Sequence, residues 1–128
     1  MNKLLWVFQI ILSLALGLFG FQKVVMPIPD LISFGMIWIE DFPAWQVRTI
    51  GALEVLGVIG LNAPYLIKKL PKLLVSVSAG ALALTMVGAI ATHVMRGDPL
   101  PSIIITSALF AMGVTVSVKR FGEANSRV

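Results

Sequence analysis

Long apolar runs, separated by short polar connections, occupy most of the chain. The runs are residues 4–22, 45–67, 72–95 and 101–120. Each is close to the roughly 20 residues that an α-helix needs to cross a bilayer. Period-two alternation of apolar and polar residues is absent, so a barrel is not expected. The pattern predicts an all-α integral membrane four-helix bundle with up-down-up-down order.

The connection between the first two runs is the longest and is broken by Pro27, Pro29 and Pro43. Within it, the apolar stretch 31–39 is too short to span a bilayer. We therefore expect a short interfacial helix between helices one and two. The four helices form a single predicted domain over residues 1–122, and the polar residues 123–128 are predicted to be a flexible C-terminal tail.

Composition identifies the solvent as lipid. The chain is 58% hydrophobic and 12% charged in 128 residues, and its mean hydropathy is +0.95. A soluble domain of this size could not bury so much apolar surface, so the lipid bilayer is the expected partner. The chain has no cysteine, which excludes disulfides, thiolate metal sites and dithiol redox chemistry within it.

The basic residues indicate the orientation in the membrane. They lie at helix ends, as membrane topology requires, and do not suggest a nucleic-acid partner. Seven of them fall on the side of the termini and the middle loop: Lys3, Lys68, Lys69, Lys72, Lys119, Arg120 and Arg127. Three fall on the other side: Lys23, Arg48 and Arg96. The distribution predicts a multi-pass protein with both termini in the cytoplasm.

Glu54 is the least expected residue in the apolar runs. Gly51, Glu54, Gly57 and Gly60 recur every three residues and therefore share one face of their helix. A face of small residues allows helix backbones to approach in lipid, so this face is predicted to point into the bundle. An acid at membrane depth is costly unless it has a partner, which makes Glu54 the leading candidate for a functional residue.

The remaining polar candidates lie near the same end of the bundle. Lys23, Arg48 and His93 are expected at similar depth, with Glu54 deeper. Because helical side chains lean toward their own N-terminus, a contact of Glu54 with His93 or with Arg48 is expected, with Thr85 below it. These residues predict an outward-opening cavity that binds a ligand or relays protons. The alternative is a structural network that fixes helix register.

Two further polar residues, Gln9 and Asn62, lie toward the opposite end of the bundle. Amides in membrane helices usually act as interhelical contacts, and we interpret both residues in this way. No metal site is expected, because one His and no Cys make a poor ligand set. Phosphate-binding, hydrolase and zinc-protease motifs are also absent from the sequence.

The second apolar run resembles the second-helix signature of DoxX-like membrane proteins. The similar stretch is Phe42–Pro64, and its specific part is the R-x-x-G-x-x-E-x-x-G block. The end of the first run, Gly20–Lys23, is similar to that family's end of helix one. Met86–Ala89 followed by His93 is similar to its third helix. The resemblance covers nearly the whole chain.

The resemblance implies a compact four-helix bundle in a bacterial plasma membrane. The family's namesake is a small subunit of a thiosulfate:quinone oxidoreductase, and some relatives join membrane complexes that handle thiol or oxidative stress. Distant eukaryotic relatives assist the assembly of receptor channels. By resemblance, Lys23, Arg48, Glu54 and His93 are the positions that match the family's polar pattern.

Three functions stay open, and whether the chain is an enzyme stays open with them. The first is an accessory subunit of an oxidoreductase or stress-response system that binds a quinone, a lipid or another amphipathic molecule in an outward-facing pocket, without a covalently bound cofactor. The second is a non-catalytic membrane chaperone or scaffold for a partner protein. The third is a small proton-coupled exporter, which ranks last because such exporters carry an essential acid in helix one, where this chain has only Gln9.

Overall fold

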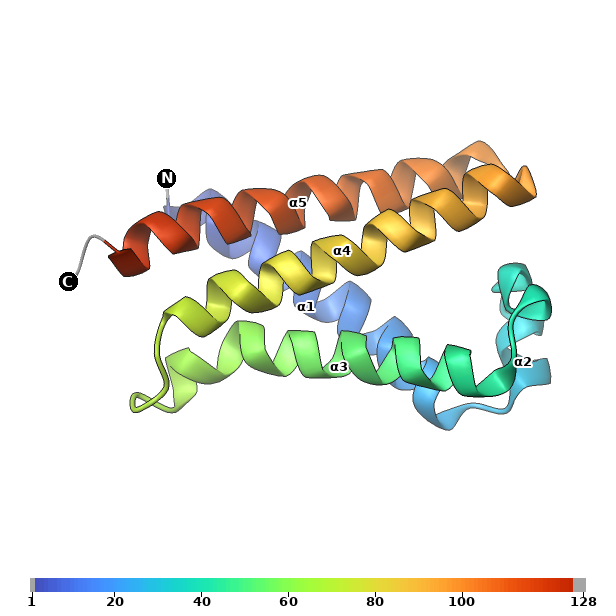
Figure 1. The fold of residues 1–128 in the computed structure, drawn as a ribbon, viewed down its shortest axis with the longest axis horizontal. Helices are drawn as coiled ribbons and strands as arrows, with labels where there is room; N and C mark the ends of the chain where they lie inside the picture. The colour runs from blue at the N-terminus through green and yellow to red at the C-terminus, as the bar shows by residue number, and fades with distance from the viewer. Residues whose placement is uncertain (1, 126–128) are drawn as a thin grey trace.

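Four long helices and two short ones make up the computed structural model, which describes residues 2–125. In chain order they are α1 (Asn2–Val25), α2 (Ile28–Ser33), the 3-10 helix η1 (Ile37–Asp41), α3 (Ala44–Leu66), α4 (Leu73–Arg96) and α5 (Leu100–Asn125). The four long helices are each long and apolar enough to cross a membrane. Figure 1 shows α2 and η1 gathered at one end of the bundle, opposite the chain termini. The prediction of an all-α four-helix bundle is confirmed.

The C-terminal helix continues further than the sequence suggests. α5 runs to Asn125, so the first residues of the predicted tail are helical. Residues 126–128 of that tail lie outside the described part of the chain.

Prolines and glycines set the helix ends at the α2–η1 end of the bundle, which we call the capped end. Pro27 and Pro43 directly precede α2 and α3, where a missing N–H costs no helical hydrogen bond. Gly97 ends α4 in the left-handed conformation, with φ of 69°. The N–H of Asp98 then donates to the carbonyl of His93 at 3.0 Å, which closes the turn into α5.

Two separate apolar clusters stabilise the fold. The larger lies between the long helices, mainly toward the termini, and includes Leu12, Leu61, Leu82 and Val116, all buried. The smaller holds α2 and η1 against the start of α3 and consists of Leu31, Ile39 and Val47 with partly buried neighbours. The space between the two clusters is where a cavity can form, because neither cluster extends across it.

Helices α1 and α3 cross at very short range through two glycines. A Cβ added at Gly51 would lie 2.6 Å from Cβ of Lys23 and 2.7 Å from the backbone oxygen of Gly20. A Cβ added at Gly20 would lie 2.9 Å from Cβ of Glu54. Only glycine permits this crossing, which confirms that the Gly51–Glu54 face points into the bundle.

The long helices form two pairs that separate toward the capped end. α4 packs along α5, and α1 packs along α3. α3 and α4 approach each other closely on the termini side of Glu54, where Gly57 faces Leu82 and Gly60 faces Ser78. Figure 1 shows α3 and α4 close together near the termini and diverging toward the capped end.

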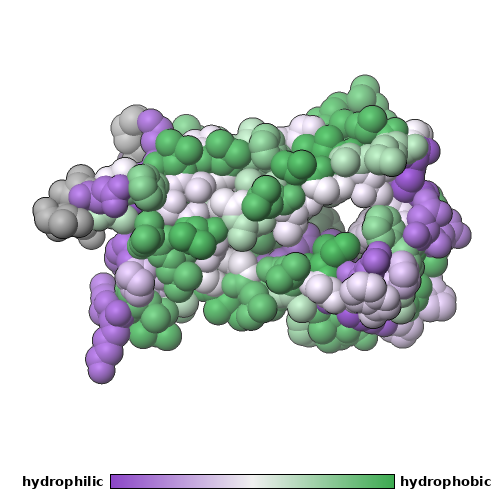
Figure 2. All heavy atoms as spheres, viewed as in Figure 1, coloured by the Kyte–Doolittle hydropathy of each residue, from purple (hydrophilic) through white to green (hydrophobic). Residues whose placement is uncertain are grey.

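Apolar side chains cover the outside of the bundle. Leu14, Leu56, Leu84 and Ile104, one from each long helix, are all more than half exposed. Figure 2 shows this apolar surface along the body of the molecule, with hydrophilic residues gathered toward its two ends. This is the distribution expected of a chain whose sides contact lipid and whose ends contact water.

Replacing Gly51 by alanine should destabilise the α1–α3 crossing. The added methyl group has backbone of α1 in its way, so we expect the free energy of unfolding to fall by about 1–3 kcal/mol. Titration with a denaturing detergent, followed by circular dichroism, measures the change. Gly88→Ala is the matched control, because a Cβ there meets nothing within 4 Å. Equal stability of the two variants would contradict the close crossing.

Candidate functional site

A buried ion pair joins α1 to α3. The ammonium nitrogen of Lys23 lies 2.7 Å from Oε1 of Glu54, and the two side chains are 9% and 2% exposed. The Lys23 nitrogen also lies 5.5 Å from the ring centroid of Trp38, in η1. The sequence predicted that Glu54 would contact His93 or Arg48, but the hydrogen bond in the structure is to Lys23. The reason is the glycine crossing, which brings these two side chains together.

Arg48 has a different position from the one expected. Its Nη1 donates to the backbone oxygen of Lys23 at 2.8 Å and to that of Met26 at 2.5 Å. These carbonyls belong to the C-terminal end of α1, where helical carbonyls have no partner within the helix. Arg48 is not among the described residues that line the cavity. It therefore holds the end of α1, including the backbone of Lys23.

A cavity of about 610 Å³ lies beside the ion pair, in the half of the bundle nearer the capped end. Its walls come from all four long helices, and its roof comes from the connection between α2 and η1. Most lining residues are apolar, among them Leu16, Phe19, Met86 and Leu109. Volume and lining both fall within the range typical of small-molecule sites.

Polar groups in the cavity lie on two opposite helix pairs. Lys23 and Glu54 contribute from α1 and α3, and His93 contributes from α4. The hydroxyl of Thr85 also lines the cavity, but it donates to the backbone oxygen of Leu82 at 2.7 Å, within its own helix. The charged or titratable side chains that a ligand can reach are thus Lys23, Glu54 and His93. Apolar surface separates the first two from the third.

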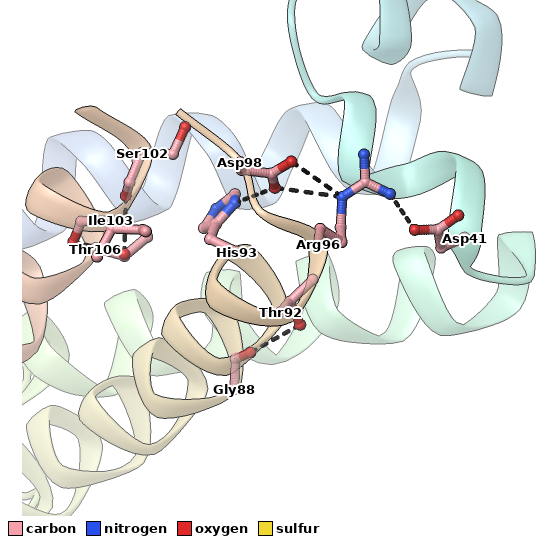
Figure 3. A network of polar contacts seen from close by, with 9 residues as sticks. All are labelled: Asp41, Gly88, Thr92, His93, Arg96, Asp98, Ser102, Ile103 and Thr106. Atoms are coloured by element: carbon pink, nitrogen blue, oxygen red, sulfur yellow. Dashed lines mark hydrogen bonds and ion pairs between the residues drawn. The ribbon is translucent and has the colours of Figure 1, made fainter. Parts of the chain in front are cut away.

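A chain of polar contacts connects His93 to residues 28–41, the segment of α2 and η1 that we call the capping segment (Figure 3). Nδ1 of His93 lies 2.7 Å from Oδ2 of Asp98. Nε of Arg96 lies 3.3 Å from Oδ1 of the same carboxylate, and Nη1 of Arg96 pairs with Asp41 in η1. Because an ionised carboxylate only accepts, Nδ1 carries the hydrogen, and Nε2 of neutral His93 is then an acceptor.

The same contacts shift the pKa of Asp98, which lies in the turn between α4 and α5. The hydrogen bond from His93 lowers the pKa of the Asp98 carboxyl below its ordinary value, and the charge of Arg96 lowers it further. Partial removal from water acts in the opposite direction and does not reverse the shift. Asp98 is therefore ionised near neutral pH and fixes the orientation of the His93 ring.

Sequence reasoning identified His93 but missed its partner. The signal was present: Asp98 directly follows Gly97, and a left-handed glycine turns the chain back toward the last turn of its helix. A polar residue just after such a glycine can reach a side chain in that last turn.

The amide residues make the interhelical contacts that were expected, but not with each other. Nε2 of Gln9 donates to the backbone oxygen of Leu61 at 2.9 Å, and Nδ2 of Asn62 donates to Oγ of Ser13 at 2.8 Å. Both bonds join α1 to α3. Arg120, one of the basic residues that the sequence places at helix ends, is 5% exposed, and its Nε donates to Oε1 of Gln9 at 3.2 Å.

Metal binding has no support in the part of the chain that the structure describes. Within residues 2–125, no group of at least three His, Cys, Asp or Glu side chains could hold a metal ion. The cavity's donor set, one ammonium, one carboxylate and one imidazole on separate helices, suits hydrogen bonding to an organic molecule better.

Comparison with known proteins gives one match. The model of the DoxX-like family matches residues 7–116, which is most of the chain and includes both halves of the ion pair and His93. No curated protein and no solved structure matches the chain.

The Lys23–Glu54 pair should be strongly coupled in stability. Removing one partner leaves a buried charge without compensation, so Lys23→Met and Glu54→Gln should each lower the free energy of unfolding by about 3–5 kcal/mol. The double variant should lose much less than the sum of the two. Detergent unfolding of all four proteins measures the coupling, and strictly additive losses would contradict a direct pair.

Stability should depend on pH through Asp98. The pKa of Asp98 is lower in the folded protein than in the unfolded chain. Below about pH 4 the unfolded chain therefore binds more protons than the folded protein, and the free energy of unfolding decreases as the pH falls further. Asp98→Asn should flatten this part of the profile. Melting temperatures between neutral pH and about pH 3 test this expectation. Asp30→Asn, an exposed change in α2, is the control and should retain the wild-type slope.

Proposed function

The chain belongs to the DoxX-like family of membrane proteins, and from this premise we propose that its cavity binds an amphipathic molecule of the quinone or lipid class. The protein would serve as an accessory membrane subunit of an oxidoreductase or stress-response system. The observation that carries the proposal is a mainly apolar cavity of about 610 Å³ with an ion pair on one side and a histidine on the other.

The two polar sides offer complementary hydrogen bonds to a head group. An ammonium has several N–H donors, so Lys23 can donate to a carbonyl while it keeps its bond to Glu54. Nε2 of His93 can accept from a hydroxyl while Asp98 holds Nδ1. A quinone ring carries oxygen atoms at opposite ends: a carbonyl oxygen can accept from Lys23, and in the reduced, hydroquinone form a hydroxyl can donate to Nε2 of His93. The apolar lining between the two sides suits the body of the ring.

The accessory role follows from the composition of the chain. Without cysteine, it has no thiol to exchange or oxidise. Thiol chemistry in such a system would therefore belong to a partner protein, and this chain would supply the binding site in the membrane. His93 and Asp98 would exchange protons between the cavity and the surface of the capped end through the contact of Nδ1 with Oδ2.

The same proposal places the protein in a bacterial plasma membrane with both termini in the cytoplasm. The bacterial membrane is what the family resemblance implies, and the orientation rests on the excess of lysine and arginine on the side of the termini and the middle loop. In this orientation the capped end and the cavity are on the outer side of the membrane.

A scaffold role is the second candidate, and one feature favours it. Phe34 and Ile37, in and beside the connection between α2 and η1, are 74% and 51% exposed. Exposed apolar residues at the water-facing end of a membrane protein can contact a partner protein as well as lipid head groups.

Gentle purification followed by mass spectrometry of bound small molecules tests the ligand proposal. The wild type should retain an amphipathic compound, and Glu54→Gln should reduce its occupancy at least about tenfold, because Lys23 loses the partner that positions it. Asp30→Asn is the matched control, since Asp30 lies outside the cavity lining. Only folded, monodisperse protein is compared. Equal occupancy in Glu54→Gln would reject the site and favour the scaffold.

A further inference from the structure

The cavity opens on the side of the bundle, between α3 and α4. Leu53 of α3 lines the cavity and is 51% exposed, and Gly88 of α4 lines it and is also exposed. A residue that is both lining and exposed marks a place where the cavity reaches the outer surface. Figure 2 shows the surface hollowed here, between the upper helices and the capping segment at the right of the view.

This opening lies at membrane depth. At about 1.5 Å per helical residue, Leu53 is about 14 Å along α3 from Ala44, and Gly88 is about 12 Å along α4 from Arg96. Both residues are therefore well inside a hydrocarbon layer about 30 Å thick. A molecule can reach the opening directly from the bilayer.

The end of the cavity that faces water is partly covered. Met36 and Trp38 roof it, while Phe34 and Gly35 line it and are themselves exposed. The capping segment is fixed at one side by the pairing of Asp41 with Arg96, and at the other by the apolar cluster around Leu31. On the α3–α4 side the cavity is reached without breaking these contacts.

We infer that the α3–α4 opening is a lateral portal for a membrane-dissolved amphiphile with a long apolar tail. The polar head lies in the cavity near Lys23 and His93, and the tail passes between Leu53 and Gly88 into the lipid. The inference rests on the proposed function and narrows its ligand class. A water-soluble metabolite has no tail to hold in lipid at this opening, while a tailed molecule keeps its tail in lipid as its head enters.

Gly88 gives the portal its width. A Cβ added at this position meets nothing within 4 Å, so the space beside the helix is free for an acyl or isoprenoid chain. Two other exposed lining residues, Phe19 of α1 and Ile105 of α5, flank the opposite seam with large side chains on both sides. On the α3–α4 side one rim residue is a glycine, and the rim is apolar apart from hydroxyls bonded within α4.

The test compares two quinones on three proteins. The probes are a dimethoxy-methyl-benzoquinone with a decyl tail and the same ring without the tail. The proteins, in lipid nanodiscs, are the parent, Gly88→Phe and Gly122→Phe. Gly122→Phe is the matched control, because Gly122 is also an exposed helical glycine with no atom within 4 Å of an added Cβ, and it lies outside the cavity. All three proteins also carry Trp6→Phe and Trp45→Phe, which leaves Trp38 as their tryptophan. Because Trp38 lines the cavity, quenching of its fluorescence by a quinone measures binding there.

Gly88→Phe should weaken binding of the tailed quinone at least about tenfold and change binding of the tail-less ring by less than about twofold. Gly122→Phe should leave both dissociation constants unchanged. Unchanged binding of the tailed quinone to Gly88→Phe would overturn the portal while leaving the proposed function in place. Equal loss of both probes in Gly88→Phe would also overturn it, because the substitution would then act on the cavity and not on the tail. If the parent protein binds neither quinone, the proposed function fails and the portal fails with it.

Discussion

The contact on which the other features depend is the crossing of α1 and α3 at Gly20 and Gly51. It brings the two backbones so close that Lys23 and Glu54 meet as an ion pair. In a membrane, a carboxylate without such a partner would be costly, so the crossing makes Glu54 tolerable at this depth. The pair in turn fixes the register of the two helices. Arg48 strengthens the arrangement by binding the carbonyls at the end of α1.

The cavity is a consequence of how the two helix pairs are joined. Small residues hold α3 against α4 only toward the termini, at Gly57 and Gly60, and the pairs diverge beyond that point. The capping segment closes the wide end without filling the space, because its apolar residues pack on one another and on Val47. A bundle that was tightly packed along its whole length would have left no room for a ligand. The position of the glycines along α3 therefore determines both the closely packed half and the hollow half.

The sequence predicted the helices well, because apolar runs of membrane length have few alternatives in lipid. It also predicted that Glu54 faces inward, since the glycines on its face identify the packing side. It did not predict the partner of Glu54, because partner choice depends on helix rotation and crossing distance, which single-helix patterns do not contain. Lys23, at a helix end, had the features of an interfacial lysine. The bond of Arg120 to Gln9 was missed for the same reason, because it joins residues from opposite ends of the chain.

The pairing of charges around the cavity bears on the choice between a quinone and a phospholipid head group. Lys23 is neutralised by Glu54, and Arg96 lies between two carboxylates, those of Asp41 and Asp98. Among the described residues that line the cavity, an anionic phosphate would thus find no unpaired Lys or Arg and would have to compete with Glu54 for Lys23, at the cost of leaving a carboxylate buried. A neutral head needs only a donor on one side and an acceptor on the other, and both are available without breaking a pair. The electrostatics of the site therefore favour a neutral, carbonyl-bearing ligand over a charged one.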